Sequence, residues 1–80
     1  MPKKFIVYGR EDCHLCEDMM ITLRNLQQEF LFEFERINID KDKNLIQLYS
    51  DRVPVLFAVK EEKELCHYFI DTVAFNNYFT

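Results

Sequence analysis

The stretch FIVYGREDCHLC occupies residues 5–16 and decides the fold. Its first four residues form a continuous apolar run, which is typical of a strand covered on both faces. Polar residues at 9–12 predict a loop, and the sequence that follows is typical of an amphipathic helix. Cys13 and Cys16 therefore lie one turn apart at the start of a helix that follows a strand. Two thiols in this arrangement can close into a disulfide and open again, as a redox motif requires.

Apolar periodicity and turn residues predict the remaining elements. We expect strands at residues 4–8, 32–39, 55–59 and 64–70, and helices at residues 14–30, 40–50 and 72–79. Asp40 and Asp71 are the expected N-caps of the last two helices. The apolar alternation changes phase between Phe34 and Ile37, which predicts a bulge or an edge position for the second strand.

This order of elements, β-α-β-α-β-β-α, predicts an α/β fold and a single domain over residues 1–80. A βαβ unit requires parallel strands with a right-handed crossover, and the last two strands form an antiparallel hairpin. We therefore expect one four-stranded mixed sheet with helices on both faces. The cysteine pair then lies at the carboxyl end of the first strand, where open α/β sheets place their sites.

Composition and charge narrow the possible partners and location. The formal net charge is −4, and the basic residues are scattered among acids, so the chain lacks the basic patch that nucleic acid or anionic membrane requires. We expect no signal peptide or membrane span, since no apolar run is long enough. An odd number of cysteines, three, does not suit a disulfide scaffold. We expect a cytoplasmic monomer with no bound cofactor and no metal.

The two thiols have different predicted roles. Cys13 lies nearer the helix start and is the predicted nucleophile, because the thiolate is the reactive form and a helix N-terminus favours negative charge. Cys16, one turn further along, is expected to lie deeper and to resolve the mixed disulfide. His14 lies between the thiols, where it would contact substrate and, if protonated, stabilise the thiolate. We expect a lowered pKa for Cys13, although neighbouring acidic residues oppose this effect.

A zinc site is an alternative role for the cysteine pair. Such a site needs two further ligands, and Cys66 and His67 are the adjacent candidates. Neighbouring residues of a strand point to opposite faces, so one metal ion cannot easily take both. We expect Cys66 to lie in the core and His67 on the surface.

With these residues in view, the chain resembles the glutaredoxin branch of the thioredoxin superfamily, and more narrowly the small glutaredoxin-like proteins of bacteria. The resemblance is carried by residues 7–16 (VYGREDCHLC), residues 38–40 (NID) and residues 51–56 (DRVPVL). The order of elements extends it over nearly all 80 residues. It implies a thioredoxin-like fold of the glutaredoxin type.

The resemblance also implies a binding site for an extended thiol substrate beside the nucleophile. Pro54 would follow a cis peptide bond, and Val53 would offer its backbone N–H and C=O to the substrate. With glutathione as substrate, Arg10 and Arg52 would bind its carboxylates and Asp71 its γ-glutamyl amine.

The chain departs from the family pattern at three places. His14 stands where glutaredoxins usually have proline, and Phe69-Ile70 replace the common Gly-Gly before the last helix. The chain also has no Trp, unlike thioredoxins, which carry one before the cysteine pair.

These observations predict a glutaredoxin-like thiol–disulfide oxidoreductase that acts on glutathione mixed disulfides or protein disulfides. Cys13 would attack the disulfide, and Cys16 or free glutathione would release the product. One alternative is a non-catalytic thioredoxin-fold module that binds a partner at Val53-Pro54. Another is a carrier of a metal ion or iron–sulfur cluster, shared between the Cys13 thiolates of two copies.

Overall fold

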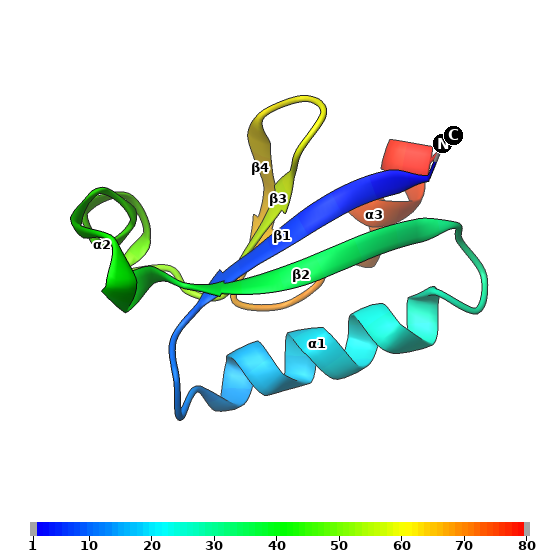
Figure 1. The fold of residues 1–80 in the computed structure, drawn as a ribbon. Coiled ribbons are helices and arrows are strands. Elements are labelled where there is room, and N and C mark those ends of the chain that lie inside the picture. Colours follow the sequence, from blue (N-terminus) through cyan, green and yellow to red (C-terminus); the bar gives the residue numbers. More distant parts are fainter. Residues whose placement is uncertain (1, 80) are drawn as a thin grey trace.

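The computed structural model describes residues 2–79 as strands and helices in the predicted order (Figure 1). The elements are β1 (Lys3–Gly9), α1 (His14–Leu26), β2 (Phe32–Asn38), the 3₁₀ turn η1 (Ile39–Lys41), α2 (Lys43–Tyr49), β3 (Val55–Ala58), β4 (Lys63–His67) and α3 (Thr72–Phe79). The predicted α/β class is confirmed. Within residues 2–79, no helix combines the length and apolar character that crossing a membrane requires.

The four strands form one mixed sheet, as predicted, and the structure gives the strand order β2-β1-β3-β4. Strand β1 is parallel to β2 and antiparallel to β3, and β4 is antiparallel to β3. The β1–β2 register runs without a shift from Lys3 opposite Phe32 to Gly9 opposite Asn38. Strand β2 is therefore an edge strand without a bulge, so the edge alternative is confirmed and the bulge alternative is wrong. The register shift in this sheet lies at Leu56, in the β3–β4 pair.

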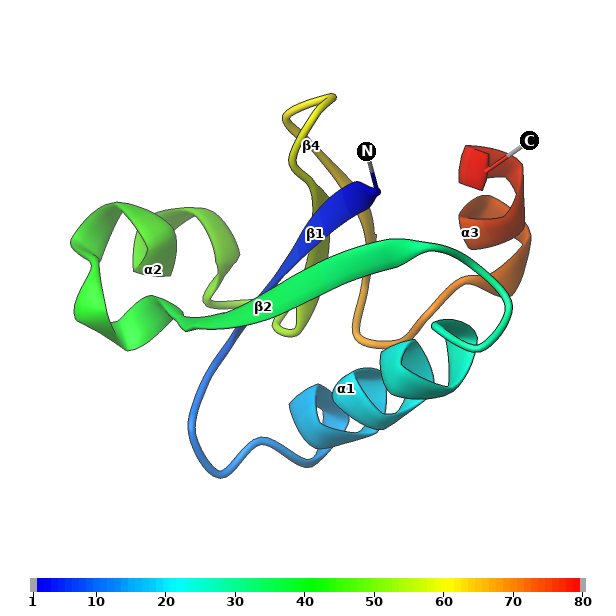
Figure 2. The same cartoon turned by 45° about the vertical axis from the view of Figure 1, so that its right-hand side comes forward.

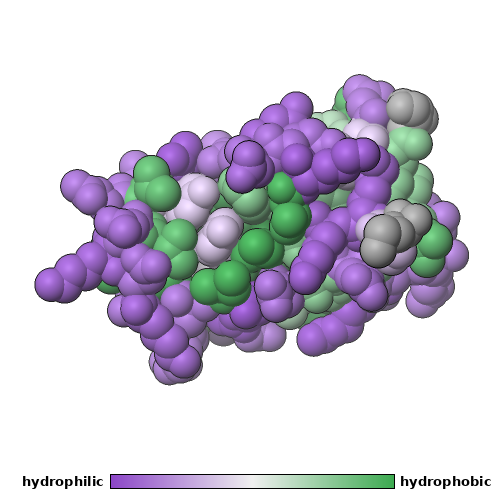
Figure 3. Space-filling view, turned by 45° about the horizontal axis from the view of Figure 1, so that its top comes forward, coloured by the Kyte–Doolittle hydropathy of each residue, from purple (hydrophilic) through white to green (hydrophobic). Residues whose placement is uncertain are grey.

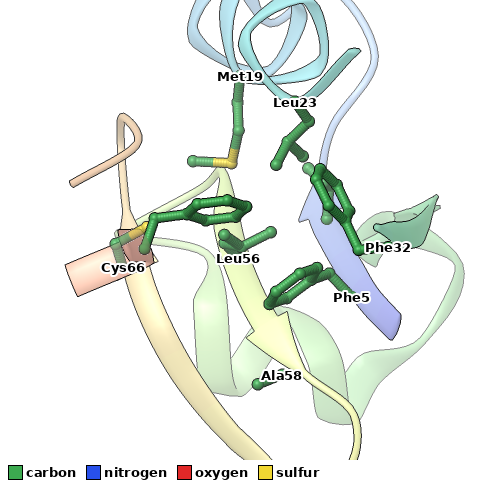
Figure 4. Close-up of a cluster of buried hydrophobic side chains, with 9 residues drawn as sticks. Phe5, Met19, Leu23, Phe32, Leu56, Ala58 and Cys66 are labelled. Atoms are coloured by element: carbon green, nitrogen blue, oxygen red, sulfur yellow. The ribbon is translucent and has the colours of Figure 1, made fainter. Parts of the chain in front are cut away.

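Helices α1 and α3 pack on one face of the sheet (Figures 1 and 2). Met19 and Leu23 of α1 and Phe75 of α3 join Phe5 and Val7 of β1 in one buried cluster. Figure 4 shows the two α1 side chains pointing toward the strands. The hydrophobic face of α1 follows from apolar residues spaced at three and four positions.

The opposite face of the sheet carries α2. The Tyr8 ring of β1 stacks on the Tyr49 ring of α2 with 4.8 Å between centroids. Because Tyr8 alternates with Val7 and Gly9 along the strand, this contact lies on the face away from α1. Figure 3, which brings the top of Figure 1 forward, shows apolar side chains gathered in the middle of the view with hydrophilic residues around them. Helices thus lie against both faces of the sheet, as expected, with α2 at the end of its face near Tyr8 (Figures 1 and 2).

Aromatic rings supply much of the core of this small protein. Phe5 is fully buried, and the rings of Phe32, Phe75 and Tyr78 lie 5.2–5.5 Å from its centroid. Aromatic pairs at such distances add about 0.5–1.5 kcal/mol each beyond the burial of their area. The aromatic content compensates for the small interior that an 80-residue chain can form.

Two predicted helix ends differ from the structure. Helix α1 stops at Leu26, and residues 27–29 form a turn that brings Phe30 against the core. Asp40 does not cap the second helix. Instead, Asn38 caps η1 by accepting a hydrogen bond from the Asp40 N–H at 2.9 Å, and Asp42 caps α2 by accepting one from Asn44 at 2.8 Å. Several side chains in this segment can cap, so composition alone did not decide among them.

Candidate active site

The cysteine pair lies where β1 ends and α1 begins. Asp12 precedes Cys13 with φ 54°, in the left-handed region that Asp tolerates better than most residues. Cys13 has an extended backbone, with φ −110° and ψ 109°, and forms the N-cap of α1. The predicted loop and helix start at His14 are thus present. The cap places one sulfur at the positive end of the helix.

Cys13 and Cys16 form a disulfide, with their Cα atoms 5.2 Å apart. The Cys13 Sγ also accepts a hydrogen bond from the Cys16 N–H at 3.1 Å. Cys13 is partly exposed, whereas Cys16 has no exposed surface. Cys13 and His14 line a surface hollow of about 300 Å³ together with Asp12 and Glu17. Of the two cysteines, only Cys13 is therefore accessible from the surface.

Gly9 makes room for the buried sulfur, a role that sequence reasoning missed. A Cβ atom added to Gly9 would lie 2.8 Å from Cys16 Sγ and 3.4 Å from Cys16 Cβ. Separations below 3.0 Å are not tolerated between such atoms, so the absent side chain permits the close approach of helix and strand. One signal was available in the sequence, because Gly9 is the single glycine of the chain and ends the first apolar run.

Arg36 of β2 is a second site residue that sequence reasoning missed. Its guanidinium donates hydrogen bonds to the Arg10 carbonyl oxygen and, at 2.7 Å, to Oε1 of Glu17. The side chain is 25% exposed. Arg36 thereby ties the edge strand to both sides of the cysteine pair, through the loop before it and the helix after it.

Carboxylates surround the cysteine pair at the surface. Four are exposed and within five residues of one of the cysteines: Glu11, Asp12, Glu17 and Asp18. Arg10 pairs with Asp40 at 3.1 Å across the site. Both partners of this pair are exposed, so its contribution to stability is about 0–1 kcal/mol and Arg10 remains free to exchange partners.

The Val53-Pro54 segment lies at the same end of the sheet as the cysteine pair. Val55 pairs with Tyr8, so the start of β3 lies beside the end of β1. The Val53–Pro54 peptide bond is cis. The Pro54 carbonyl accepts a hydrogen bond from Tyr68 at 2.8 Å, whereas the Val53 main chain has no hydrogen bond from any part of residues 2–79. Val53 therefore presents free backbone groups at this end of the sheet.

Arg52 anchors the segment before Pro54. It donates to the Leu48 carbonyl at 2.8 Å and pairs with Glu64 at 3.2 Å. Tyr68 fastens the same segment from the other side, because its hydroxyl donates to the Asp51 carbonyl at 2.7 Å. The Arg52 guanidinium is thus engaged by neighbouring groups.

Asp71 caps α3, as predicted. Its Oδ1 accepts hydrogen bonds from the Val73 and Ala74 N–H groups, both at 3.1 Å. Asp71 lines a hollow of about 360 Å³ that Cys13 does not line. The structure therefore does not place Asp71 and the leading thiol in one cavity.

Cys66 lies in the core, as predicted, and His67 lies on the surface. Burial raises the pKa of the Cys66 thiol, so this cysteine is a poor thiolate. His67 pairs with Glu64 through Nδ1 at 2.7 Å. No group of three or more metal-ligating side chains comes together within the described part of the chain.

Comparisons with known proteins agree with this geometry. The family described as Glutaredoxin-like domain (DUF836) matches residues 4–79. A search of curated proteins gave no match. Protein Ne2328 from Nitrosomonas europaea, a solved structure, is 59% identical with a TM-score of 0.92, and the alignment covers 98% of this chain and 92% of that chain.

Two more distant structures share the architecture. Protein XcR50 from X. campestris is 27% identical with a TM-score of 0.67, over 94% of this chain and 93% of that chain. Thioredoxin 1 from Thermosipho africanus shares the fold at 16% identity and a TM-score of 0.64, over 95% of this chain and 93% of that chain. The molecule is thus an α/β protein with a thioredoxin-like fold and a Cys-x-x-Cys pair. It belongs to the glutaredoxin-like domain family.

Proposed function

We propose that the protein is a thiol–disulfide oxidoreductase, with Cys13 as the nucleophile and Cys16 as the resolving thiol. One observation carries the proposal: the two cysteines are bonded to each other at a helix N-terminus, and only Cys13 reaches the surface. The Cys16 N–H that donates to Cys13 Sγ would also stabilise a thiolate there. A buried second thiol one turn away suits intramolecular release of the product.

The reaction divides into two exchanges. The Cys13 thiolate attacks one sulfur of a substrate disulfide, forming a mixed disulfide while the first substrate thiolate leaves and takes a proton from water. The Cys16 thiol loses its proton and attacks Cys13 Sγ, which forms the Cys13–Cys16 disulfide and releases the second thiolate. Two electrons and two protons pass from the protein dithiol to the substrate, so an external thiol must restore the dithiol.

Glutathione is the reductant that we assign to this step. Two glutathione molecules supply two electrons and two protons and leave as glutathione disulfide. The free Val53 backbone groups beside β1 support β-strand-like capture of an extended thiol peptide. Arg10, whose ion pair is exposed, is the cation best able to receive a carboxylate. The reduced state of Cys66 and the use of glutathione both suit the cytoplasm.

Single cysteine variants test the proposal. The assay is reduction of a glutathione mixed disulfide of a small thiol, coupled to glutathione reductase. We expect Cys13→Ser to abolish turnover, and Cys16→Ser to accumulate protein whose mass is increased by one glutathione. Cys66→Ala is the matched control and should retain the parental rate per folded molecule. Parental activity in Cys13→Ser would refute the assignment, and no exchange by the parent protein would favour the non-catalytic binding module.

A further inference from the structure

Arg36 contacts the loop between β1 and α1 (residues 10–13, the redox loop) through the Arg10 carbonyl. This contact connects Arg36 with the chemistry proposed above. We propose that Arg36 is a positioning residue whose charge stabilises the reduced form of the Cys13–Cys16 pair and thereby sets its reduction potential. The inference rests on the proposed oxidoreductase function and adds a residue outside the Cys-x-x-Cys stretch to that function.

The position of Arg36 follows from the register of the sheet. Arg36 lies opposite Val7, whose buried side chain faces α1, so the arginine starts on the same face of the sheet. Its Nε lies 3.9 Å from the position that a Cβ of Gly9 would occupy, and Cys16 Sγ lies 2.8 Å from that same position. The guanidinium and the buried sulfur therefore border the same small space above Gly9.

Two hydrogen-bonded partners fix the guanidinium in this place. The Arg10 carbonyl holds it from the loop side, and the Glu17 carboxylate holds it from the first turn of α1 at 2.7 Å. Arg36 is the least exposed of the three arginines near the site, at 25% against 36% for Arg10 and 39% for Arg52. A fixed, partly desolvated cation acts more strongly on a nearby charge than a mobile, solvated one.

The charge of Arg36 acts differently on the two redox states. In the disulfide both sulfurs are neutral, whereas the reduced pair carries a negative charge on Cys13. The Cα atoms of Cys13 and Cys16 lie 5.2 Å apart, so a cation beside Cys16 also stabilises that charge. Stabilising the reduced form makes the couple more oxidising. Glu17 offsets part of this charge, and further exposed carboxylates act in the same direction as Glu17: Glu11, Asp12 and Asp18. Arg36 is thus the main opposing charge on the buried side of the pair.

Redox titration of the intact protein against glutathione tests the inference. We expect Arg36→Gln to shift the equilibrium constant about tenfold toward the disulfide form, which corresponds to a potential lower by about 30 mV. The alkylation rate of Cys13 at neutral pH should fall, because less thiolate is present. Arg36→Lys should recover at least half of the shift, since it keeps the charge. The matched control Arg24→Gln removes the same charge from the last turn of α1 and should shift the constant less than twofold.

A second variant tests the charge argument with Arg36 itself unchanged, because glutamine at position 17 removes the charge but keeps an oxygen that can accept a hydrogen bond from the guanidinium. Glu17→Gln removes an exposed carboxylate and should shift the equilibrium about threefold or more toward the dithiol, opposite in sign to Arg36→Gln. The inference would be overturned if folded Arg36→Gln had an equilibrium constant with glutathione within twofold of the parent. If Arg36→Gln does not fold, the same result for Glu17→Gln would overturn it. Equal effects of Arg36→Gln and Arg24→Gln would do the same. If the parent pair cannot be cycled between dithiol and disulfide, the proposed function itself fails.

Discussion

Replacing Gly9 by alanine should strain the contact between β1 and the buried cysteine. The new methyl carbon would lie 2.8 Å from Cys16 Sγ, well inside van der Waals distance. The sulfur cannot rotate away in the oxidised protein, because it is bonded to Cys13. Gly9 does not have a positive φ, so alanine meets no backbone penalty there. Any destabilisation by the substitution therefore arises from this contact.

The magnitude follows from two opposing effects. Inserting one methyl group into a filled interior costs about 1–3 kcal/mol. Replacing glycine by alanine reduces the entropy of the unfolded chain, which stabilises the folded protein by about 0.4–1 kcal/mol. We expect the oxidised Gly9→Ala protein to lose about 1–2 kcal/mol of unfolding free energy. For a chain of this size, each kcal/mol corresponds to about 4–8 °C in Tm.

A double-mutant cycle isolates the contact. The free energy of unfolding is measured by urea denaturation for the oxidised parent and Gly9→Ala, and again for both proteins in a Cys16→Ala background. Without the sulfur, the entropic gain should prevail, so Gly9→Ala should be neutral or slightly stabilising in that background. The same destabilisation in both backgrounds would refute the reasoning, because it would show that the methyl group strains something other than Cys16.

Three further substitutions test the packing and the electrostatics. Asp71→Ala should cost about 0.5–2 kcal/mol in urea denaturation through loss of the α3 N-cap, while the reduction potential stays unchanged. Phe75→Ala should cost about 3–5 kcal/mol, measured in the same way, because the ring is fully buried against Phe5. Burial, and then the hydrogen bond to Glu61, raise the pKa of Tyr78 to about 12 from an ordinary value of 10.0. Because this pKa is higher in the folded than in the unfolded protein, Tyr78 stabilises the fold below pH 10, and this contribution is lost as the pH rises toward 12. The unfolding free energy of Tyr78→Phe should therefore fall less between pH 10 and pH 12 than that of the parent.

Much of the architecture could be predicted because local patterns determine it. The apolar run before the cysteine pair predicted β1 to within one residue at each end, and the helical spacing after it predicted the start of α1 at His14. Asp71 was predicted as a cap because an acceptor side chain directly precedes the last predicted helix, at residues 72–79. The length of α1 was overestimated, since the turn after Leu26 places Phe30 in the core at a spacing that also fits a longer helix.

Residue spacing alone predicted the part of the site whose residues are neighbours in sequence, whereas Val53-Pro54 was placed beside it by the family resemblance. The cysteine pair was found by its spacing. The close packing of Cys16 against Gly9 was not predicted. Gly9 lies in a strand and Cys16 in a helix seven residues further along, and such a contact leaves no periodic pattern in the sequence. Arg52 and Asp71 were expected to be available to substrate, yet both are engaged by contacts that appear only after folding: Arg52 pairs with Glu64, and Asp71 caps a helix.

The change of phase in β2 shows how a departure from pattern points to a site. Phe32, Phe34 and Arg36 lie on the face of the sheet that packs against α1, so the arginine stands where alternation calls for an apolar residue. No bulge compensates for it. Sequences that specify one fold depart from their local rules mainly at functional positions. The apparent defect in the strand is therefore the residue that reaches the redox loop.

The edge position of β2 explains how the protein tolerates this arginine. A guanidinium on a central strand would be fully desolvated, at a cost of several kcal/mol unless every donor were paired. At the edge, Arg36 keeps 25% of its side chain exposed and satisfies its inward donors with the Arg10 carbonyl and the Glu17 carboxylate. The charge thus stays partly hydrated on one side and lies close to the buried sulfur on the other. Because β2 is an edge strand that runs beside the loop before Cys13, its arginine can act on the charge of the cysteine pair without full desolvation.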